Sequence, residues 1–173
     1  MVLDPYFAAQ FIHGYKALLL EIELETSGSH ARPIIERLVT ARKRLYRDRS
    51  LLKEALNGVK AKNFEISAAV IDAIEDLKIE QWIYLRDTTR YSIFIHPKGH
   101  SAFGVMGLTD PIRSIVGGFG VVVEAGLVYY CGQFVCDGLI SRGPFLGPNY
   151  RKSYAQTYRS VKADGHFYVT YNT

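Results

Sequence analysis

Residues 66–86 read ISAAVIDAIEDLKIEQWIYLR, and the spacing of their apolar residues changes near Leu77. Before Leu77 the apolar side chains recur every three or four residues, the period of one helix face. After it comes a run of apolar, aromatic and β-branched residues from Trp82 to Leu85, which is typical of a strand. The change divides the chain into a helical part, residues 1–77, and a mainly β part, residues 78–173.

The helical part contains three amphipathic segments, which predict three helices. The first starts at Asp4-Pro5, because a side-chain oxygen can cap a helix and proline fits the first helical position. Asn63 is the expected cap of the third helix, and Asp48 interrupts the apolar seam of the second. The expected helices span about residues 5–25, 31–57 and 63–77.

The β part alternates apolar runs with short turns, which favours antiparallel hairpins in a meandering sheet. A fourth helix, capped by Asn149, and a last strand over residues 167–171 follow these runs. The expected strands are 82–86, 91–96, 102–106, 120–130 and 134–140. The predicted fold is therefore α+β: one domain, residues 1–173, with a three-helix layer packed on a curved antiparallel sheet of five to six strands and a further helix near the C-terminus.

Composition indicates a protein with a sizeable core. The 173 residues are 48% hydrophobic and include 12 Tyr and 9 Phe, which excludes a disordered chain and suggests a homo-oligomer. The chain start lacks a basic region, and the most apolar window, residues 115–131, is shorter than the roughly 20 residues that a bilayer requires. Two cysteines are too few for a disulfide framework. We expect a cytoplasmic protein that does not enter the membrane and needs no cofactor.

Two regions concentrate positive charge. Residues 32–53 hold eight basic and two acidic residues, but the helices predicted on either side are acidic, which favours internal pairing over phosphate binding. Between Gly138 and Ala163 there is no acidic residue, and the cations alternate with aromatic residues. Cations beside aromatic faces are what single-stranded nucleic acids bind. The predicted binding residues are Arg142, Tyr150, Arg151, Lys152, Arg159 and Lys162.

A second interpretation of this C-terminal segment assigns its tyrosines to the core. Tyr150, Tyr154 and Tyr158 are four residues apart, so they line one side of a helix. If all three pack inward, only the cations remain for an anionic partner.

Metal and thiol chemistry have weak signatures. His96, His100, Cys131 and Cys136 could together supply a zinc ligand set, but their spacing matches no known zinc motif, so we expect no metal. Neither cysteine is followed by a helix start, and Asp137 would raise the pKa of its neighbour Cys136, which argues against a catalytic thiolate.

An enzyme is the alternative function, and a few carboxylates and histidines are compatible with it. The glycine-rich residues 117–120 precede a strand and not a helix, so they do not form a phosphate loop. Glu124 or Asp137 could act as acid or base with a histidine such as His96.

Three functions therefore remain. The first is a non-enzymatic binding or regulatory domain that contacts an anionic partner such as nucleic acid through residues 142–162. The second is a small-molecule enzyme with a pocket between sheet and helices. The third is an assembly subunit of a protein complex.

Overall fold

The structure, a computed structural model, describes residues 1–24 and 32–170. It contains two compact units, Tyr6–Lys78 and Met1–Pro5 with Ile79–Thr173, which we call the helical unit and the β unit. The first residues belong to the β unit, where the Leu3 amide donates to the Gly107 carbonyl at 2.9 Å. The units divide where the hydrophobic period changes, and the α+β fold class is as predicted.

Four helices form the described part of the helical unit: α1 (Pro5–Leu24), α2 (Ile34–Arg47), α3 (Ser50–Ala61) and α4 (Ala68–Glu75). The single predicted helix over 31–57 is wrong, because the helix is interrupted at Asp48 and two helices form instead. The Asp48 backbone is extended, and its carboxylate accepts hydrogen bonds from the amide and hydroxyl of Ser50 at 3.0 and 2.6 Å. Asp48 thus ends one helix and stabilises the start of the next.

The predicted cap at Asn63 is also wrong. Asn63 has φ +56°, and its amide donates to the Lys60 carbonyl at 2.9 Å, so it terminates α3. Asparagine tolerates the left-handed conformation that commonly ends helices. The α4 helix begins later, after Ser67.

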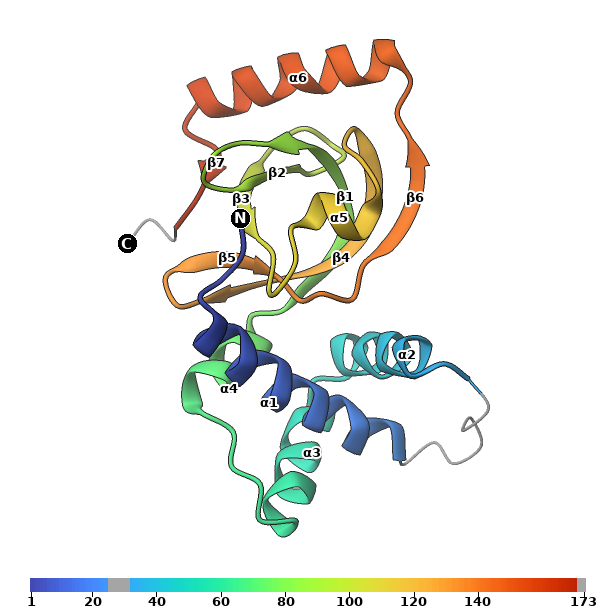
Figure 1. Cartoon of the computed structure of the whole chain (residues 1–173), viewed down its shortest axis with the longest axis vertical. Helices are drawn as coiled ribbons and strands as arrows, with labels where there is room; N and C mark the ends of the chain where they lie inside the picture. Colours follow the sequence, from blue (N-terminus) through green and yellow to red (C-terminus); the bar gives the residue numbers. More distant parts are fainter. Residues whose placement is uncertain (25–31, 171–173) are drawn as a thin grey trace. The chain divides into compact units, whose positions relative to one another are not determined.

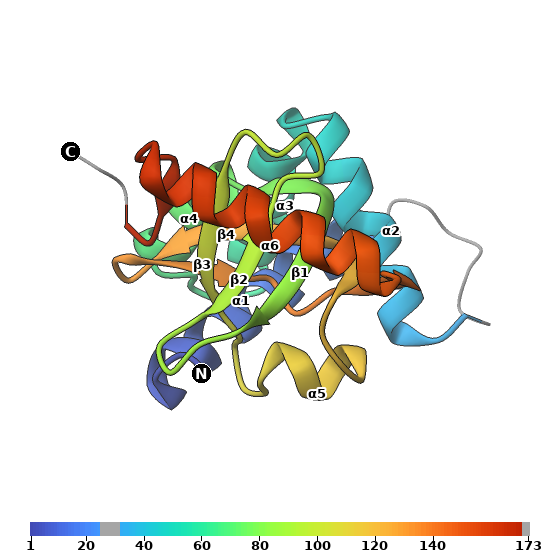
Figure 2. The ribbon, with the colours of Figure 1, turned by 90° about the horizontal axis from the view of Figure 1, so that it is seen from above.

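The strands of the β unit close into a barrel. They are β1 (Lys78–Asp87), β2 (Ser92–Ile95), β3 (Ala102–Met106), β4 (Val121–Tyr130), β5 (Gln133–Cys136), β6 (Ser141–Phe145) and β7 (Phe167–Tyr168). Their order is β1-β2-β3-β5-β4-β6, and a further pairing joins β1 to β4. The short helix α5 (Ile112–Val116) lies at one end of the barrel, in front of the strands in Figure 1 and to one side of them in Figure 2.

The sheet is mixed, so the expected antiparallel meander is wrong. β3 pairs in parallel with β5, through Val105 and Phe134, and also with β7. The connection through α5 carries the chain away from β3, which frees β3 to pair with a strand later in the sequence.

The predicted strand over 134–140 is too long, because β5 ends at Cys136 and the next strand, β6, begins only at Ser141. β5 and β6 pair with successive parts of β4, and the Asp137 carboxylate separates them by accepting hydrogen bonds from the amides of Gly126 and Leu139 at 3.2 and 3.1 Å. Gly138 between them has φ +80°. β6 itself was not predicted.

The barrel interior follows the alternation of its strands. Trp82 and Tyr84 of β1 point inward, as do four residues of β4 at every second position: Val121, Val123, Ala125 and Leu127. Ile112 and Val116 of α5 belong to the same core cluster.

Helix α6 (Pro148–Ala163) covers part of the barrel's outer surface and crosses β1, β2 and β3 (Figure 2). Tyr158 and Val161 pack there against apolar residues of these strands: Ile83, Leu85, Ile93, Ile95 and Ala102. Every residue of β2 is buried, since one side faces the interior and the other faces α6.

Candidate functional site

The basic run of the helical unit is largely engaged in internal contacts. Arg37 donates two hydrogen bonds to Glu23, at 2.8 and 2.6 Å, and this contact raises the pKa of Arg37. Arg44 donates to the Ile22 carbonyl at 2.7 Å, near the end of α1. Arg49 donates to the carbonyls of Ile74 and Leu77 at 3.2 and 2.6 Å. These carbonyls lie at the C-terminal end of α4, where a cation interacts favourably with the helix dipole. These contacts agree with the internal pairing that the sequence favoured.

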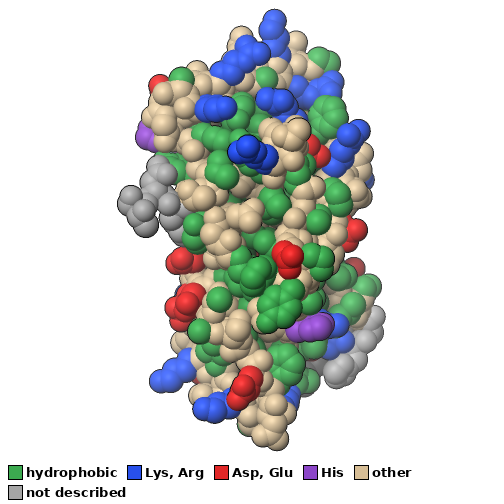
Figure 3. Space-filling model, turned by 60° about the vertical axis from the view of Figure 1, so that its left-hand side comes forward, with side chains coloured by type: hydrophobic (Ala, Val, Ile, Leu, Met, Phe, Trp, Pro, Cys, Tyr) green, Lys and Arg blue, Asp and Glu red, His purple; other side chains and the backbone are tan. Residues whose placement is uncertain are grey.

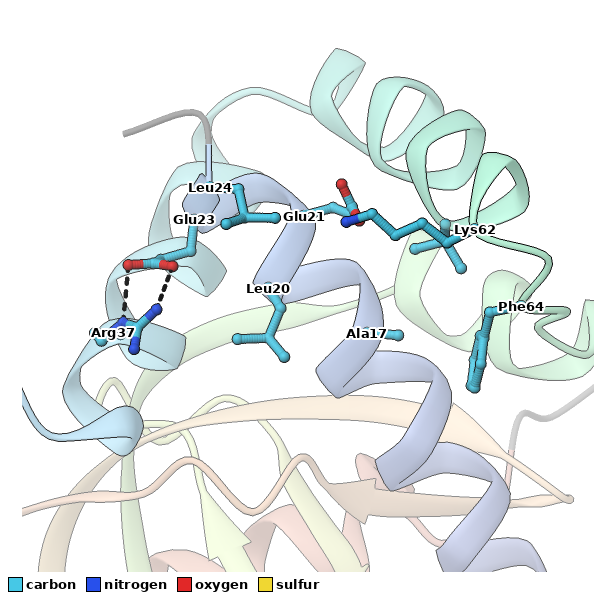
Figure 4. Close-up of a pocket in the computed structure, with 9 residues that line it drawn as sticks. Ala17, Leu20, Glu21, Glu23, Leu24, Arg37, Lys62 and Phe64 are labelled. Carbon is cyan, nitrogen blue, oxygen red and sulfur yellow. Dashed lines mark hydrogen bonds and ion pairs between the residues drawn. The ribbon is translucent and has the colours of Figure 1, made fainter. Parts of the chain in front are cut away.

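An apolar hollow of about 440 Å³ lies in the helical unit between α1, α2 and the end of α3 (Figure 4). Its charged groups pair with each other, Arg37 with Glu23 and Lys62 with Glu21. The apolar lining consists of Ala17, Leu20, Leu24, Val59 and Phe64. Its charges are mutually neutralised, so the hollow offers no charged group to an anionic ligand.

The predicted cations of the β unit are arranged differently. All five side chains are exposed, and within residues 1–24 and 32–170 none of them forms an ion pair: Arg142, Arg151, Lys152, Arg159 and Lys162. On the face shown in Figure 3, Lys and Arg side chains gather over α6. These cations are therefore available to a partner.

The three tyrosines of α6 have different environments. Tyr158 is 7% exposed and meets the Phe167 ring edge-on, and burial raises its pKa. Tyr154 is half-buried, and its hydroxyl donates to the Pro97 carbonyl at 3.3 Å. Tyr150, in the first turn of the helix, is 67% exposed. Core packing is thus confirmed for two of the three tyrosines, and Tyr150 stays a predicted binding residue.

Side chains from β6 and α6 cover the glycine-rich loop, residues 117–120. Arg142 donates to the Val116 carbonyl at 3.5 Å. The Phe145 ring lies over Gly118, where an added Cβ would be 3.0 Å from the ring. The Arg151 side chain lies over Gly120, where an added Cβ would be only 2.5 Å from Cδ. The glycines therefore allow this close approach.

Two further residues complete this surface, and sequence reasoning missed both. The Arg113 guanidinium lies 5.3 Å from the centroid of the Phe119 ring, as Arg142 lies 5.7 Å from that of Phe145. The signal in the sequence was a phenylalanine within a glycine run. We name the set the arginine–aromatic surface: Arg113, Phe119, Arg142, Phe145, Tyr150 and Arg151.

The predicted acid–base residues have other contacts. His96 Nε2 lies 2.8 Å from a Glu80 carboxylate oxygen, and its Nδ1 accepts from the Lys98 amide at 3.2 Å. Both ring nitrogens are thus engaged, and in the described part of the chain neither Glu124 nor Asp137 is among the contacts of His96. Glu124 is half-buried on the outward side of β4, between two inward positions.

The four candidate metal ligands do not converge on one point. The rings of His96 and His100 are 4.0 Å apart, but Cys136 is 1% exposed in the barrel core and Cys131 lies in the β4–β5 turn. Burial raises the pKa of Cys131, which is unfavourable for a thiolate ligand. Among the residues that the structure describes, no three His, Cys, Asp or Glu side chains are placed to hold a metal ion.

No protein-family model, curated protein or solved structure matches this chain. None of the helices in the described residues has the length and apolar character that crossing a bilayer requires.

On the outer surface of the barrel, α6 covers apolar residues of β1, β2 and β3. A cavity of about 440 Å³ remains beside β3, lined by Arg90, Tyr91, Gly104, Met106, Gln133 and Val169. The arginine–aromatic surface shares no residue with the lining of this cavity.

Proposed function

We propose that the β unit is a binding domain for an anionic polymer, with nucleic acid as the ligand class. The observation that carries the proposal is the contrast between the two basic runs. Arg37, Arg44 and Arg49 of the helical unit bind a carboxylate or the carbonyls at a helix end. The cations of α6, in contrast, are exposed and form no ion pair with a described carboxylate.

The α6 helix presents these cations in a regular way. Lys152 and Arg159 are seven residues apart, so they lie on one helix face about 10 Å from each other. The buried Val161 belongs to the opposite face, against the barrel. A flexible polyanion could contact several of these cations at once. Binding of this kind gains free energy from counterion release and weakens as salt rises.

The test is a fluorescence-anisotropy titration of a labelled single-stranded RNA and a labelled DNA duplex at several salt concentrations. The variant combines Arg151→Gln with Lys152→Gln, which keeps most of each aliphatic stem. If both side chains contact phosphates of a single strand, the slope of log K against log salt should fall by about 1.4 in magnitude. Affinity should fall with it.

The matched control removes two exposed cations from the helical unit, Lys53→Gln with Lys60→Gln. This variant has the same net charge as the first, and its binding should equal that of the unmodified chain. Absence of binding at low salt would overturn the proposal. An equal loss in both variants would do so as well, because it would show a response to net charge alone.

A further inference from the structure

We infer that the polymer is single-stranded nucleic acid and that Phe119, Phe145 and Tyr150 receive its unpaired bases. This inference rests on the proposed function and specifies its ligand. It adds a second kind of contact, base stacking, to the contacts between cations and phosphates.

The first observation is the exposure of large aromatic rings. Phe119 is 44% exposed, Phe145 is 52% exposed and Tyr150 is 67% exposed. The phenylalanine side chain has no group that can hydrogen-bond to water, so two half-exposed rings on one surface favour a partner that covers them.

The second observation is the charge beside these rings. Arg113 lies over Phe119 and Arg142 over Phe145, both within cation–π distance. Arg151 follows Tyr150 directly in the first turn of α6. Within the described residues, Arg113, Arg142 and Arg151 form no ion pair. An apolar protein partner would leave these cations buried and uncompensated, whereas a nucleic acid supplies both a ring for the aromatic side chain and a phosphate for the cation.

The third observation is the loop that brings these residues together. Phe119 belongs to the glycine-rich loop, and Phe145 and Arg151 lie directly over Gly118 and Gly120. Phe119 and Phe145, which are 26 positions apart in the sequence, therefore both lie at this loop. Rings that lie at one loop can receive neighbouring bases of a strand.

The stacking contacts select a single strand over a duplex. In a duplex each base is stacked on its neighbours, so an aromatic side chain reaches a base face only where the strand is unpaired. The exposed side chains of this surface are cations and aromatics, with no carboxylate between Gly138 and Ala163. We therefore expect little sequence preference, because every base has a face to stack.

The experiment replaces the stacking faces and keeps the charges. Phe119→Leu with Phe145→Leu retains apolar side chains but removes both rings, and both positions are exposed, so the fold should persist. Circular dichroism and thermal unfolding check this. Affinity for a single-stranded oligonucleotide should fall roughly five-fold or more, with the salt slope unchanged and duplex affinity unaffected.

The matched control is Phe64→Leu, which removes a ring that is 42% exposed in the helical unit and should leave binding unchanged. Single-strand affinity that is equal in the double variant and the unmodified chain would overturn the inference and leave the proposed function standing. Equal affinity of the unmodified chain for single strand, duplex and poly-glutamate would also overturn it, since charge alone would then explain binding. No binding to any of the three polymers would overturn both.

Discussion

At the scale of single residues, the β4–β5 turn contains a side chain poorly suited to its backbone. Cys131 and Gly132 have φ of +50° and +78°, and they connect the paired residues Tyr130 and Gln133. A two-residue hairpin turn with both φ values positive favours Asn-Gly. Cys131 therefore bears a conformational cost that asparagine would reduce.

We predict that Cys131→Asn raises the free energy of unfolding by about 0.5–1 kcal/mol. Urea unfolding at an unchanged m value would measure it. Cys131→Ser is the control, because serine keeps the strained backbone without the thiol. If serine stabilises as much as asparagine, removal of the thiol and not relief of the turn is the cause.

At the scale of elements, α6 shows how one sequence pattern serves two roles. Its three tyrosines repeat every four residues, but the barrel covers only the later part of the stripe. We predict that Tyr158→Ala lowers the free energy of unfolding by about 3–4 kcal/mol, since it removes a ring that packs in a core cluster.

The paired variant is Tyr150→Ala, whose side chain is exposed. It should change the free energy of unfolding by no more than about 0.5 kcal/mol. Equilibrium unfolding in urea measures both. Similar losses in the two variants would contradict the assignment of Tyr150 to the surface.

The elements that could be predicted are those with a local signal. The change of period near Leu77, the span of β3 and the approximate ends of α1 and α6 follow from hydrophobic spacing and helix-end residues. The helix is interrupted at Asp48, where the carboxylate accepts hydrogen bonds from Ser50. The apolar pattern would be the same if the helix continued, so hydrophobic spacing could not predict the interruption.

Non-local pairing limited the prediction of the sheet. The parallel contact of β3 with β5 joins segments that are separated by α5 and β4, and no short-range signal records it. β6 reads SRGPF and lacks alternation, so it resembled a loop, yet it pairs with β4.

The candidate site, like the sheet, could be predicted only in part. Its cations stand out by composition, because an acid-free segment is visible in the sequence. Arg113 and Phe119 become part of it only when the chain folds and Phe145 comes to lie over Gly118. Their contribution could not be read from spacing.

At the scale of the whole molecule, the net charge of +4 is the sum over a chain that contains two kinds of basic region. Arg37, Arg44 and Arg49 of the helical unit bind its own carboxylates and carbonyl groups, so they contribute to its structure. The basic side chains of residues 142–162, in the β unit, remain exposed beside aromatic rings. A polyanion should therefore recognise one unit of the chain and not the other.

This expectation can be tested on the intact chain by nuclear magnetic resonance. When a single-stranded oligonucleotide is added to isotope-labelled protein, we predict shift changes in residues 117–120, β6 and the first turn of α6. Amides of α1 to α4 should not respond, because Arg37 and Arg44 of α2 already have internal partners. Changes centred on α2 would contradict this division of charge. Changes centred on Arg90 and Gln133 would instead place the ligand in the cavity beside β3. Because each amide reports on its own surroundings, the pattern distinguishes these surfaces without altering any side chain.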